Sequence, residues 1–307
     1  YSDLYRRYST YCRNYDGNQL FKIASGASDY DYNWTEVLMK NVGGRMDGLS
    51  LHYYTVAGWT GSKGSATRFT DDDYYWTLGK CREIEDVLKR HMAIMDRYDP
   101  KKQIALMVDE WGTWWDEEPG TVPGHLFQQN TMRDAFVASL TLDIFHKYTD
   151  RVKMTNIAQI ANVLHSMILT KGDKMVLTPT YYVFKMYNVH QDAVYLPLDL
   201  QCERRIVRDN RILPMISATA SRDKAGKIHV SLSNVDLENG QEVTVKLDGI
   251  SGKSVSGCIL TSGHIGDCNT FDKPDAVALK SFNGARITKK GIAVKLPAKS
   301  IVTLEIN

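Results

Sequence analysis

The chain has 307 residues, 43% of them hydrophobic and 24% charged, and its 38 basic and 36 acidic residues leave a formal net charge of +2. This composition is typical of a globular protein with one large domain or two of ordinary size. The near balance of charge argues against a nucleic-acid-binding protein, and no apolar run is long enough to cross a bilayer, which argues against a membrane protein.

The chain begins in a helix-like segment, 1–15, with Tyr1 in place of an initiator Met. We therefore expect the natural N-terminus, together with any targeting signal, to be missing from this chain. The sequence accordingly assigns no cellular compartment, whether cytoplasmic, periplasmic or secreted.

Strand-like and helix-like segments then alternate up to about residue 189. Four segments are predicted to be strands, at 20–25, 46–54, 104–109 and 152–160. The predicted helices are 34–42, 71–98, 131–148 and 179–189, and a Gly/Ser/Thr-rich loop covers 57–70. Such alternation indicates an α/β fold with parallel strands joined by right-handed crossovers. A closed barrel of this type needs eight strands over about 250 residues, so residues 1–189 form either half a barrel or a complete smaller open sheet.

After residue 190 the pattern changes to an alternation of apolar and polar residues. This period of two is typical of the strands of an antiparallel β-sandwich. It occurs at 227–233, 242–247, 256–260, 292–296 and 300–306, with turn residues between the segments. We therefore predict two domains, 1–189 and 190–307, and expect no catalytic residue in the second.

The strongest candidate for a catalytic residue follows the predicted strand 104–109. This strand runs into Asp109 and Glu110, and Trp111, Trp114 and Trp115 follow within five residues of Glu110. In parallel α/β folds the functional side chains gather at such strand ends. Aromatic rings can stack on sugars, and paired carboxylates hydrolyse glycosides. The alternative is a solvated pair of acids at a strand exit, but the tryptophans favour a glycosidase site.

Two further strand ends carry polar residues. Strand 46–54 ends in His52 and Tyr54, and 152–160 contains Asn156 and Gln159. A lone histidine is usually a satisfied core or surface residue, although the neighbouring tyrosines favour a functional role for His52. Asn156 and Gln159 would need a polar partner or a ligand if the strand buries them, because an unpaired buried amide is costly.

Five stretches of the sequence carry a resemblance to a known family. They are MDGLSLHYYTV (46–56), IALMVDEWGTWW (104–115), MTNIAQIANVL (154–164), LTPTYYVFKMY (177–187) and NTFDKPDAV (269–277). Together they resemble the α-L-arabinofuranosidases of glycoside hydrolase family fifty-one. The resemblance implies the second half of a (β/α)8 TIM barrel, followed by an antiparallel β-sandwich of jelly-roll type. It also implies an enzyme that removes terminal arabinofuranose from arabinan, arabinoxylan or short oligosaccharides, with retention of configuration.

The resemblance implies roles for individual residues. Glu110 of the DEW motif corresponds to the nucleophile, which would form a covalent arabinosyl-enzyme. His52 and Tyr54 of the HYY motif would lie near it. Gln159 of the NIAQ motif would hydrogen-bond the bound sugar, and Trp114 would help to wall the pocket. No metal or nucleotide cofactor is implied.

The sequence departs from the family pattern in two ways. Gly112 stands where the family usually has Asn after the DEW tryptophan, which puts one local hydrogen bond in doubt. The family's acid/base Glu lies in a Gly-Asn-Glu motif at the end of the fourth barrel strand, just upstream of a helix that resembles 1–15, and no such motif occurs here. The chain alone is therefore expected to lack the acid/base and to be inactive.

The expected partners follow from the same reasoning. The substrate would be an arabinose-containing oligosaccharide or polysaccharide. The two unpaired sheet edges, 20–25 and 152–160, would be covered by the missing N-terminal half of the barrel or by a second copy of the chain, so a homo-oligomer stays open. Two alternatives also stay open. One is a non-catalytic carbohydrate-binding half-barrel, and the other is a related barrel glycosidase acting on a xyloside or a glucan.

Overall fold

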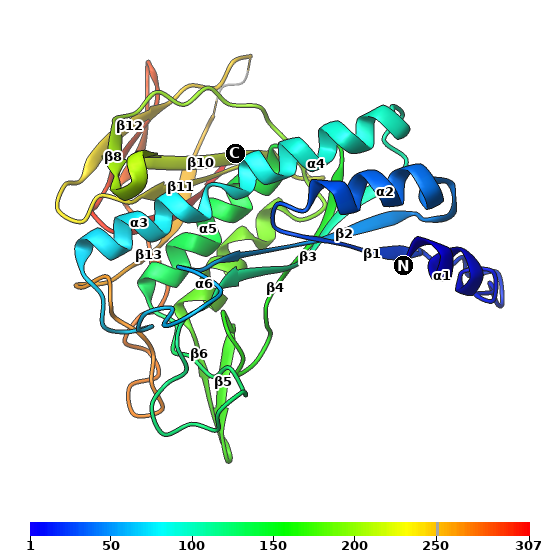
Figure 1. Ribbon diagram of the computed structural model, residues 1–307. Helices are drawn as coiled ribbons and strands as arrows, with labels where there is room; N and C mark the ends of the chain where they lie inside the picture. Colours follow the sequence, from blue (N-terminus) through cyan, green and yellow to red (C-terminus); the bar gives the residue numbers. More distant parts are fainter. Residues whose placement is uncertain (250–251) are drawn as a thin grey trace.

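A four-stranded parallel sheet organises the first part of the chain (Figure 1). The computed structural model describes residues 1–249 and 252–307. In the sheet, strands lie in the order β1-β2-β3-β4, so the four predicted parallel strands are confirmed and β1 and β4 form its edges. The strands are β1 (Ile23–Ser28), β2 (Gly48–Thr55), β3 (Ala105–Thr113) and β4 (Val152–Ile157).

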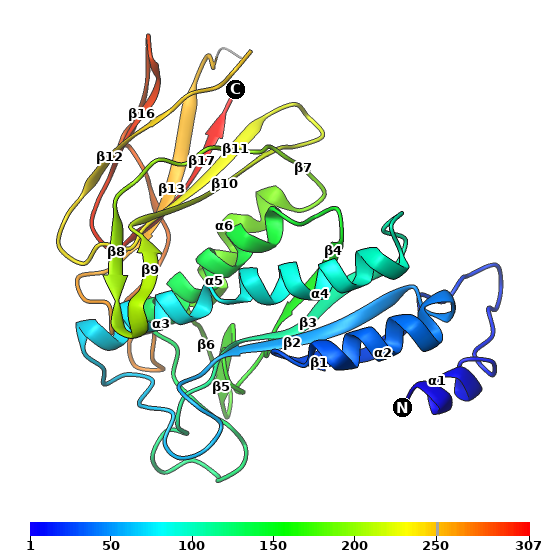
Figure 2. The ribbon, with the colours of Figure 1, turned by 45° about the horizontal axis from the view of Figure 1, so that its top comes forward.

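The helices that follow these strands begin at residues suited to capping. Thr70 and Asp73 form a capping box at the start of α3, and Thr131 and Asp134 form another at the start of α5. Figure 2 shows α3, α4, α5 and α6 between the parallel sheet and the strands of the second part. The helices are α2 (Tyr32–Val42), α3 (Asp71–Cys81), α4 (Ile84–Tyr98), α5 (Met132–His146) and α6 (Pro179–Tyr187).

The N-terminal helix is shorter than predicted. Helix α1 covers only Ser2–Tyr8 instead of 1–15. None of its residues is buried, and Tyr8, Tyr11 and Tyr15 are all exposed. Short helices are marginal in water without a packed face, so the pattern of residues alone does not extend this one.

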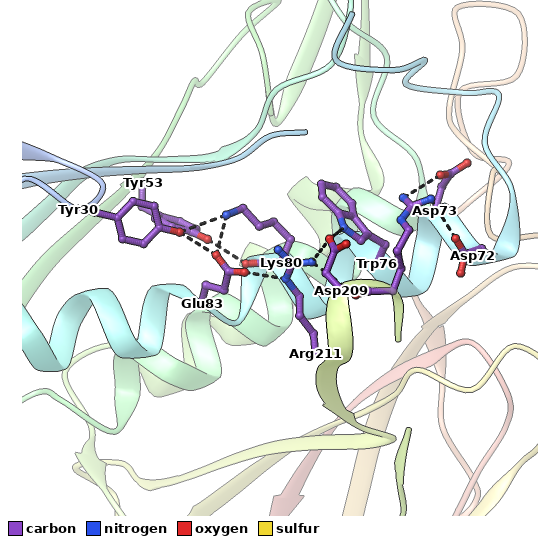
Figure 3. Close-up of polar contacts among 10 residues, drawn as sticks. Tyr30, Tyr53, Asp72, Asp73, Trp76, Lys80, Glu83, Asp209 and Arg211 are labelled. Carbon is purple, nitrogen blue, oxygen red and sulfur yellow. Dashed lines mark hydrogen bonds and ion pairs between the residues drawn. The ribbon is translucent and has the colours of Figure 1, made fainter. Parts of the chain in front are cut away.

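The single helix predicted over 71–98 is in fact two helices, which break at Arg82 and Glu83. At the break the Glu83 carboxylate accepts hydrogen bonds from Tyr30 at 2.7 Å, Lys80 at 2.6 Å and Arg211 at 2.6 Å (Figure 3). Two of these partners come from distant parts of the chain. Hydrophobic periodicity along the sequence does not contain these long-range contacts, so it does not predict the break.

The strand boundaries also differ from the predicted ones. β1 covers Ile23–Ser28 rather than 20–25, and β4 ends at Ile157 rather than at 160. β3 continues to Thr113, so Asp109 and Glu110 lie inside the strand and not after its end. An antiparallel hairpin that was not predicted, β5 (Ile168–Lys171) and β6 (Lys174–Leu177), follows β4.

The second part of the chain is the predicted antiparallel β-sandwich. One sheet has the order β14-β13-β17-β11-β10-β7 and the other β12-β16-β15. Apolar side chains such as Val230 and Val302 from the first sheet and Val294 from the second share one core. A separate hairpin, β8–β9, packs on α3. The strands are β7 (Val194–Tyr195), β8 (Arg204–Val207), β9 (Arg211–Pro214), β10 (Ile216–Arg222), β11 (Ile228–Asn234), β12 (Gln241–Val245), β13 (Val255–Thr261), β14 (Lys280–Ser281), β15 (Ala285–Thr288), β16 (Gly291–Leu296) and β17 (Ser300–Ile306).

The outer face of the larger sheet packs on α5 and α6 through buried polar groups. The carboxylate of Asp143 accepts hydrogen bonds from Tyr187 at 2.8 Å and Ser217 at 2.6 Å. His190 lies 2.7 Å from the hydroxyl of Ser221. These contacts fix the sandwich against the helical layer. No helix of the described residues is long and apolar enough to cross a membrane.

Candidate active site

Glu110 and His52 face each other across two neighbouring parallel strands. His52 of β2 is the register partner of Glu110 of β3. Its Nδ1 lies 3.3 Å from Glu110 Oε2, and its Nε2 lies 3.3 Å from Asp109 Oδ1. The side chain of Glu110 is 38% exposed, so a reacting group can reach this carboxylate.

Irregular strand pairing explains how adjacent residues reach the same histidine. Side chains normally alternate between the two faces of a strand. Here the register between β2 and β3 shifts between Ser50 and His52, and the register between β3 and β4 shifts between Val108 and Trp111. Such irregularities re-aim side chains, and they are common beside active sites.

Tyr54 holds the other oxygen of Glu110. Its hydroxyl donates a hydrogen bond to Glu110 Oε1 at 2.5 Å. The Tyr54 ring meets Trp114 edge-on at 5.1 Å and Trp59 at 6.3 Å, and the two indoles lie 5.6 Å apart. The carboxylate thus has one oxygen near His52 and the other on Tyr54, beside an aromatic wall suited to a sugar face.

The electrostatics of this group favour an ionised Asp109. The carboxylate of Asp109 raises the pKa of His52, with Glu110 adding to the effect and partial burial opposing it. Burial alone would raise the pKa of Asp109, but interactions with His52 and Ser50 outweigh it and the pKa is lowered. Burial, reinforced by the bond to Glu110, raises the pKa of Tyr54 well above its usual value, so its hydroxyl remains a donor.

Gln159 and Asn156 lie at the same end of the sheet as Glu110. Ile157, the last residue of β4, pairs with Trp111, and the next backbone N–H, of Ala158, donates to Trp111 O at 2.8 Å. Both amide side chains are exposed, which removes the argument that burial would force them to find partners. The reason is that β4 is an edge strand, with no neighbour within the described chain on its outer side.

The three tryptophans after Glu110 take different positions. Only Trp114 joins the aromatic wall beside Tyr54. Trp111 is 1% exposed and packs against Phe145 in the core. Trp115 is buried against the guanidinium of Arg133. Sequence proximity to Glu110 is therefore a poor guide to which indole can meet a sugar.

Two residues of the site were not identified from the sequence. Asp29, directly after β1, has its pKa raised by burial, while Lys80, the Tyr54 backbone and the Trp59 indole oppose the rise. Its own N–H donates to His52 O at 2.9 Å. Trp59 lies in the loop predicted over 57–70. The position of Asp29 at a strand end was the available signal, whereas nothing in the sequence distinguishes Trp59.

Within residues 1–249 and 252–307 no group of three His, Cys, Asp or Glu side chains is arranged to hold a metal ion. The site geometry therefore consists of one accessible carboxylate, a histidine between two acids and an aromatic wall. An accessible carboxylate held in this way can attack an electrophilic carbon.

Comparison with known proteins defines the family. Residues 109–300 match the model described as the alpha-L-arabinofuranosidase C-terminal domain. The chain belongs to the α-L-arabinofuranosidase C-terminal domain family. The resemblance to family fifty-one α-L-arabinofuranosidases is thereby confirmed.

Individual relatives agree with the family model. It is 70% identical over 307 residues to an intracellular exo-alpha-L-arabinofuranosidase of Bacteroides ovatus, covering 100% of the chain and 60% of that protein. The crystal structure of the family fifty-one arabinofuranosidase of Xanthomonas axonopodis pv. citri aligns with a TM-score of 0.96 at 46% identity, covering 100% of the chain and 62% of that structure. The family fifty-one α-L-arabinofuranosidase of Bifidobacterium longum shares the fold, with a TM-score of 0.79 at 21% identity, over 93% of the chain and 58% of that structure. The chain thus spans about 60% of the length of the relatives it matches.

Proposed function

We propose that this chain carries the nucleophile of a retaining α-L-arabinofuranosidase that releases terminal arabinofuranose from arabinan- or arabinoxylan-type glycans. The observation that carries this proposal is the meeting of Glu110, His52 and Tyr54 at one end of the parallel sheet. The 70% identity to the Bacteroides ovatus enzyme supports the choice of substrate.

In the proposed reaction Glu110 attacks the anomeric carbon. A bond forms from its carboxylate oxygen to that carbon as the glycosidic C–O bond breaks, and a general acid protonates the departing oxygen. Water, deprotonated by the same group, then displaces Glu110 and restores the free carboxylate. Tyr54 and His52 orient the nucleophile, Gln159 hydrogen-bonds the sugar, and Trp114 walls the pocket.

We assign the acid/base to residues outside this chain. A retaining enzyme places its two carboxyl groups about 5–5.5 Å apart. Asp109 is a poor acid, since His52 and Ser50 outweigh its burial and lower its pKa. The absence of a Gly-Asn-Glu motif from the sequence supports the same assignment. Asp29, with its raised pKa, is the rival acid within the chain.

We further propose that residues 1–189 are the second half of a (β/α)8 barrel and residues 190–307 its β-sandwich domain. The free edges of β1 and β4 would then pair with the missing half of the barrel or with another copy of the chain. Residues 1–307 expressed alone should associate or aggregate and should not cleave an aryl arabinofuranoside. A monomer that cleaves this substrate unaided would reject both the half-barrel and the external acid.

The function is tested on the complete protein with aryl glycosides. Glu110→Gln should lower kcat for an aryl α-L-arabinofuranoside by several orders of magnitude, because no other group forms the covalent intermediate. Glu242→Gln, on the exposed face of β12, is the control and should leave kcat unchanged. Asp29→Asn should lower kcat far less than Glu110→Gln does if the acid/base lies outside the chain.

Three outcomes would reject parts of this proposal. Near-normal activity of Glu110→Gln would reject the nucleophile. Faster cleavage of xylosides or glucosides would reject the substrate, and sugar binding without hydrolysis would favour a carbohydrate-binding protein.

A further inference from the structure

A cavity lies between the two parts of the chain. Its volume is about 480 Å³. The loop 57–70, the start of α3, the start of α5 and the turn at Arg208 and Asp209 surround it. Figure 3 shows three residues that line this cavity, Asp73, Trp76 and Asp209, with the hydrogen bond that Trp76 donates to Asp209. No residue of the Glu110 site lines this cavity.

The cavity has an excess of positive charge. Lys63, Arg68, Arg133 and Arg208 line it, against the carboxylates of Asp73 and Asp209. Both carboxylates are already neutralised.

Asp73 pairs with Arg208 at 3.1 Å, and Asp209 pairs with Arg211. Within the described residues Lys63, Arg68 and Arg133 form no ion pair, so the lining of the cavity keeps more cations than carboxylates.

Arg133 is the most unusual of the three. It is 1% exposed, and its guanidinium lies between the rings of Phe69 at 3.7 Å and Trp115 at 3.6 Å. Its Nη2 donates to the carbonyls of Ser65 and Ala66, but its Nε has no partner. Burial lowers the pKa of Arg133 to about 10. A buried charge of this kind is costly unless an anion completes its shell.

The loop that carries two of these cations is held in place beside the candidate active site. Asp116 accepts hydrogen bonds from Ser62 and from the Lys63 N–H, the latter at 2.8 Å. The Lys63 ammonium lies 5.6 Å from the centre of the Trp114 ring, on the aromatic wall near Glu110. The Trp114 ring therefore connects the loop that lines the cavity with the Tyr54 side of the candidate active site.

We propose that this cavity binds the carboxylate of a uronic acid residue on an acidic arabinose-bearing glycan. Its assignment to the substrate rests on the function proposed for Glu110. The carboxylate would face Lys63 and Arg68, close to the buried guanidinium of Arg133. The volume exceeds the needs of an inorganic anion, and the hydroxyl of Ser65 with the Trp76 indole suits a sugar ring.

Binding is measured first, on the complete protein and without catalysis. Isothermal titration calorimetry with free D-glucuronate and with free D-galacturonate should show saturable binding of at least one of them. Neutral D-glucose, D-galactose and inorganic phosphate should bind at least about tenfold more weakly. No uronate binding, or phosphate binding as tight as that of the uronates, would overturn the proposal.

Charge-removing variants then locate the site. The double variant Lys63→Ala/Arg68→Ala should weaken uronate binding at least about tenfold, as expected for the loss of two charge-assisted contacts. Arg286→Ala/Lys289→Ala, which removes two charges from the exposed β15 hairpin, should not change it. Equal affinity of both double variants would overturn the site.

Activity measurements connect the cavity to the substrate. Arg68→Ala alone should lower kcat/KM for a uronate-bearing arabinoglycan severalfold and leave kcat/KM for a neutral aryl arabinofuranoside unchanged. An equal effect on both substrates would overturn the substrate role. A protein that binds uronates but hydrolyses neither substrate would instead reject the function proposed for Glu110.

Discussion

At the scale of single residues, the site depends on how Glu110 is held. His52 lies near one of its oxygens and Tyr54 donates to the other. His52 also lies 3.3 Å from Asp109, and the lowered pKa of Asp109 keeps that neighbour ionised. One histidine therefore fixes two carboxylates, of which only Glu110 is bonded to Tyr54.

Tyr54→Phe removes the hydroxyl bonded to Glu110 and keeps the ring against Trp114. A hydrogen bond to a charged group contributes about 1.5–3 kcal/mol, so kcat of the complete enzyme should fall by about 10–100-fold. The melting temperature should change little. Tyr195→Phe, outside the site, is the control. An unchanged kcat would show that the nucleophile does not need this donor.

Gly112→Ala tests why glycine follows the DEW tryptophan. Gly112 has φ +149°, and a Cβ there would lie 2.8 Å from His165 Cβ. The variant should lose about 2 kcal/mol or more of unfolding free energy, through the backbone and the clash. A Cβ added at Gly44 would have no atom of a non-neighbouring residue within 4 Å, so Gly44→Ala should lower the unfolding free energy far less. Equal stability of the two variants in denaturant titrations would reject this explanation.

Residue types predicted much of the candidate site, because strand ends in parallel sheets carry functional side chains. The proximity of Glu110, His52 and Tyr54 followed from this rule. The orientation of the tryptophans did not, since it depends on strand pairing and on helices from elsewhere. Asp29 was missed because the strand before it was predicted to end at residue 25, whereas β1 ends at Ser28.

At the scale of secondary structure, the strands were predictable in number and order, whereas several boundaries were not. Continuous apolar runs covered on both faces identify β2 and β3 well. The break between α3 and α4 coincides with tertiary contacts of Glu83, and the β5–β6 hairpin lies in a region without strong alternation. Local sequence patterns therefore predict neither the break between the two helices nor the hairpin.

Arg151→Met tests how β4 is attached to the helical layer. The Arg151 side chain is fully buried and donates to Asp99 Oδ2 at 2.7 Å and to Ile104 O at 2.9 Å. Removing one partner of a buried ion pair typically costs about 3–5 kcal/mol. Arg97→Met, which breaks an exposed pair with Glu36, should cost under about 1 kcal/mol. Similar losses for the two variants in urea unfolding would contradict the account.

At the scale of the whole molecule, the sandwich is held on α5 and α6 by a buried polar interface. Asp143 lies at its centre, and burial raises its pKa to about 7 despite hydrogen bonds from Ser217 and Tyr187. Because the folded pKa lies above the usual value, the protonated form favours folding. The free energy of unfolding should therefore fall as pH rises from about 4 to about 7.

Asp143→Asn removes this titration while keeping a polar side chain. Between about pH 5 and pH 7 the native protein should lose up to about 1.4 kcal/mol per pH unit relative to the variant. The measurement is denaturant unfolding of both proteins across this range. Asp248→Asn, on an exposed turn, is the control and should track the native protein. A pH-independent difference between native protein and Asp143→Asn would contradict a protonated Asp143.

The central claim is that Glu110 is the nucleophile of an arabinofuranosidase, and trapping the covalent intermediate tests it most directly. The complete protein is mixed with an activated aryl α-L-arabinofuranoside, quenched in acid and digested for peptide mass spectrometry. We expect the peptide that contains Glu110 to gain the mass of one pentosyl residue, and Glu110→Gln to abolish the gain. A pentosyl group on another carboxylate, with Glu110 unmodified, would contradict the account.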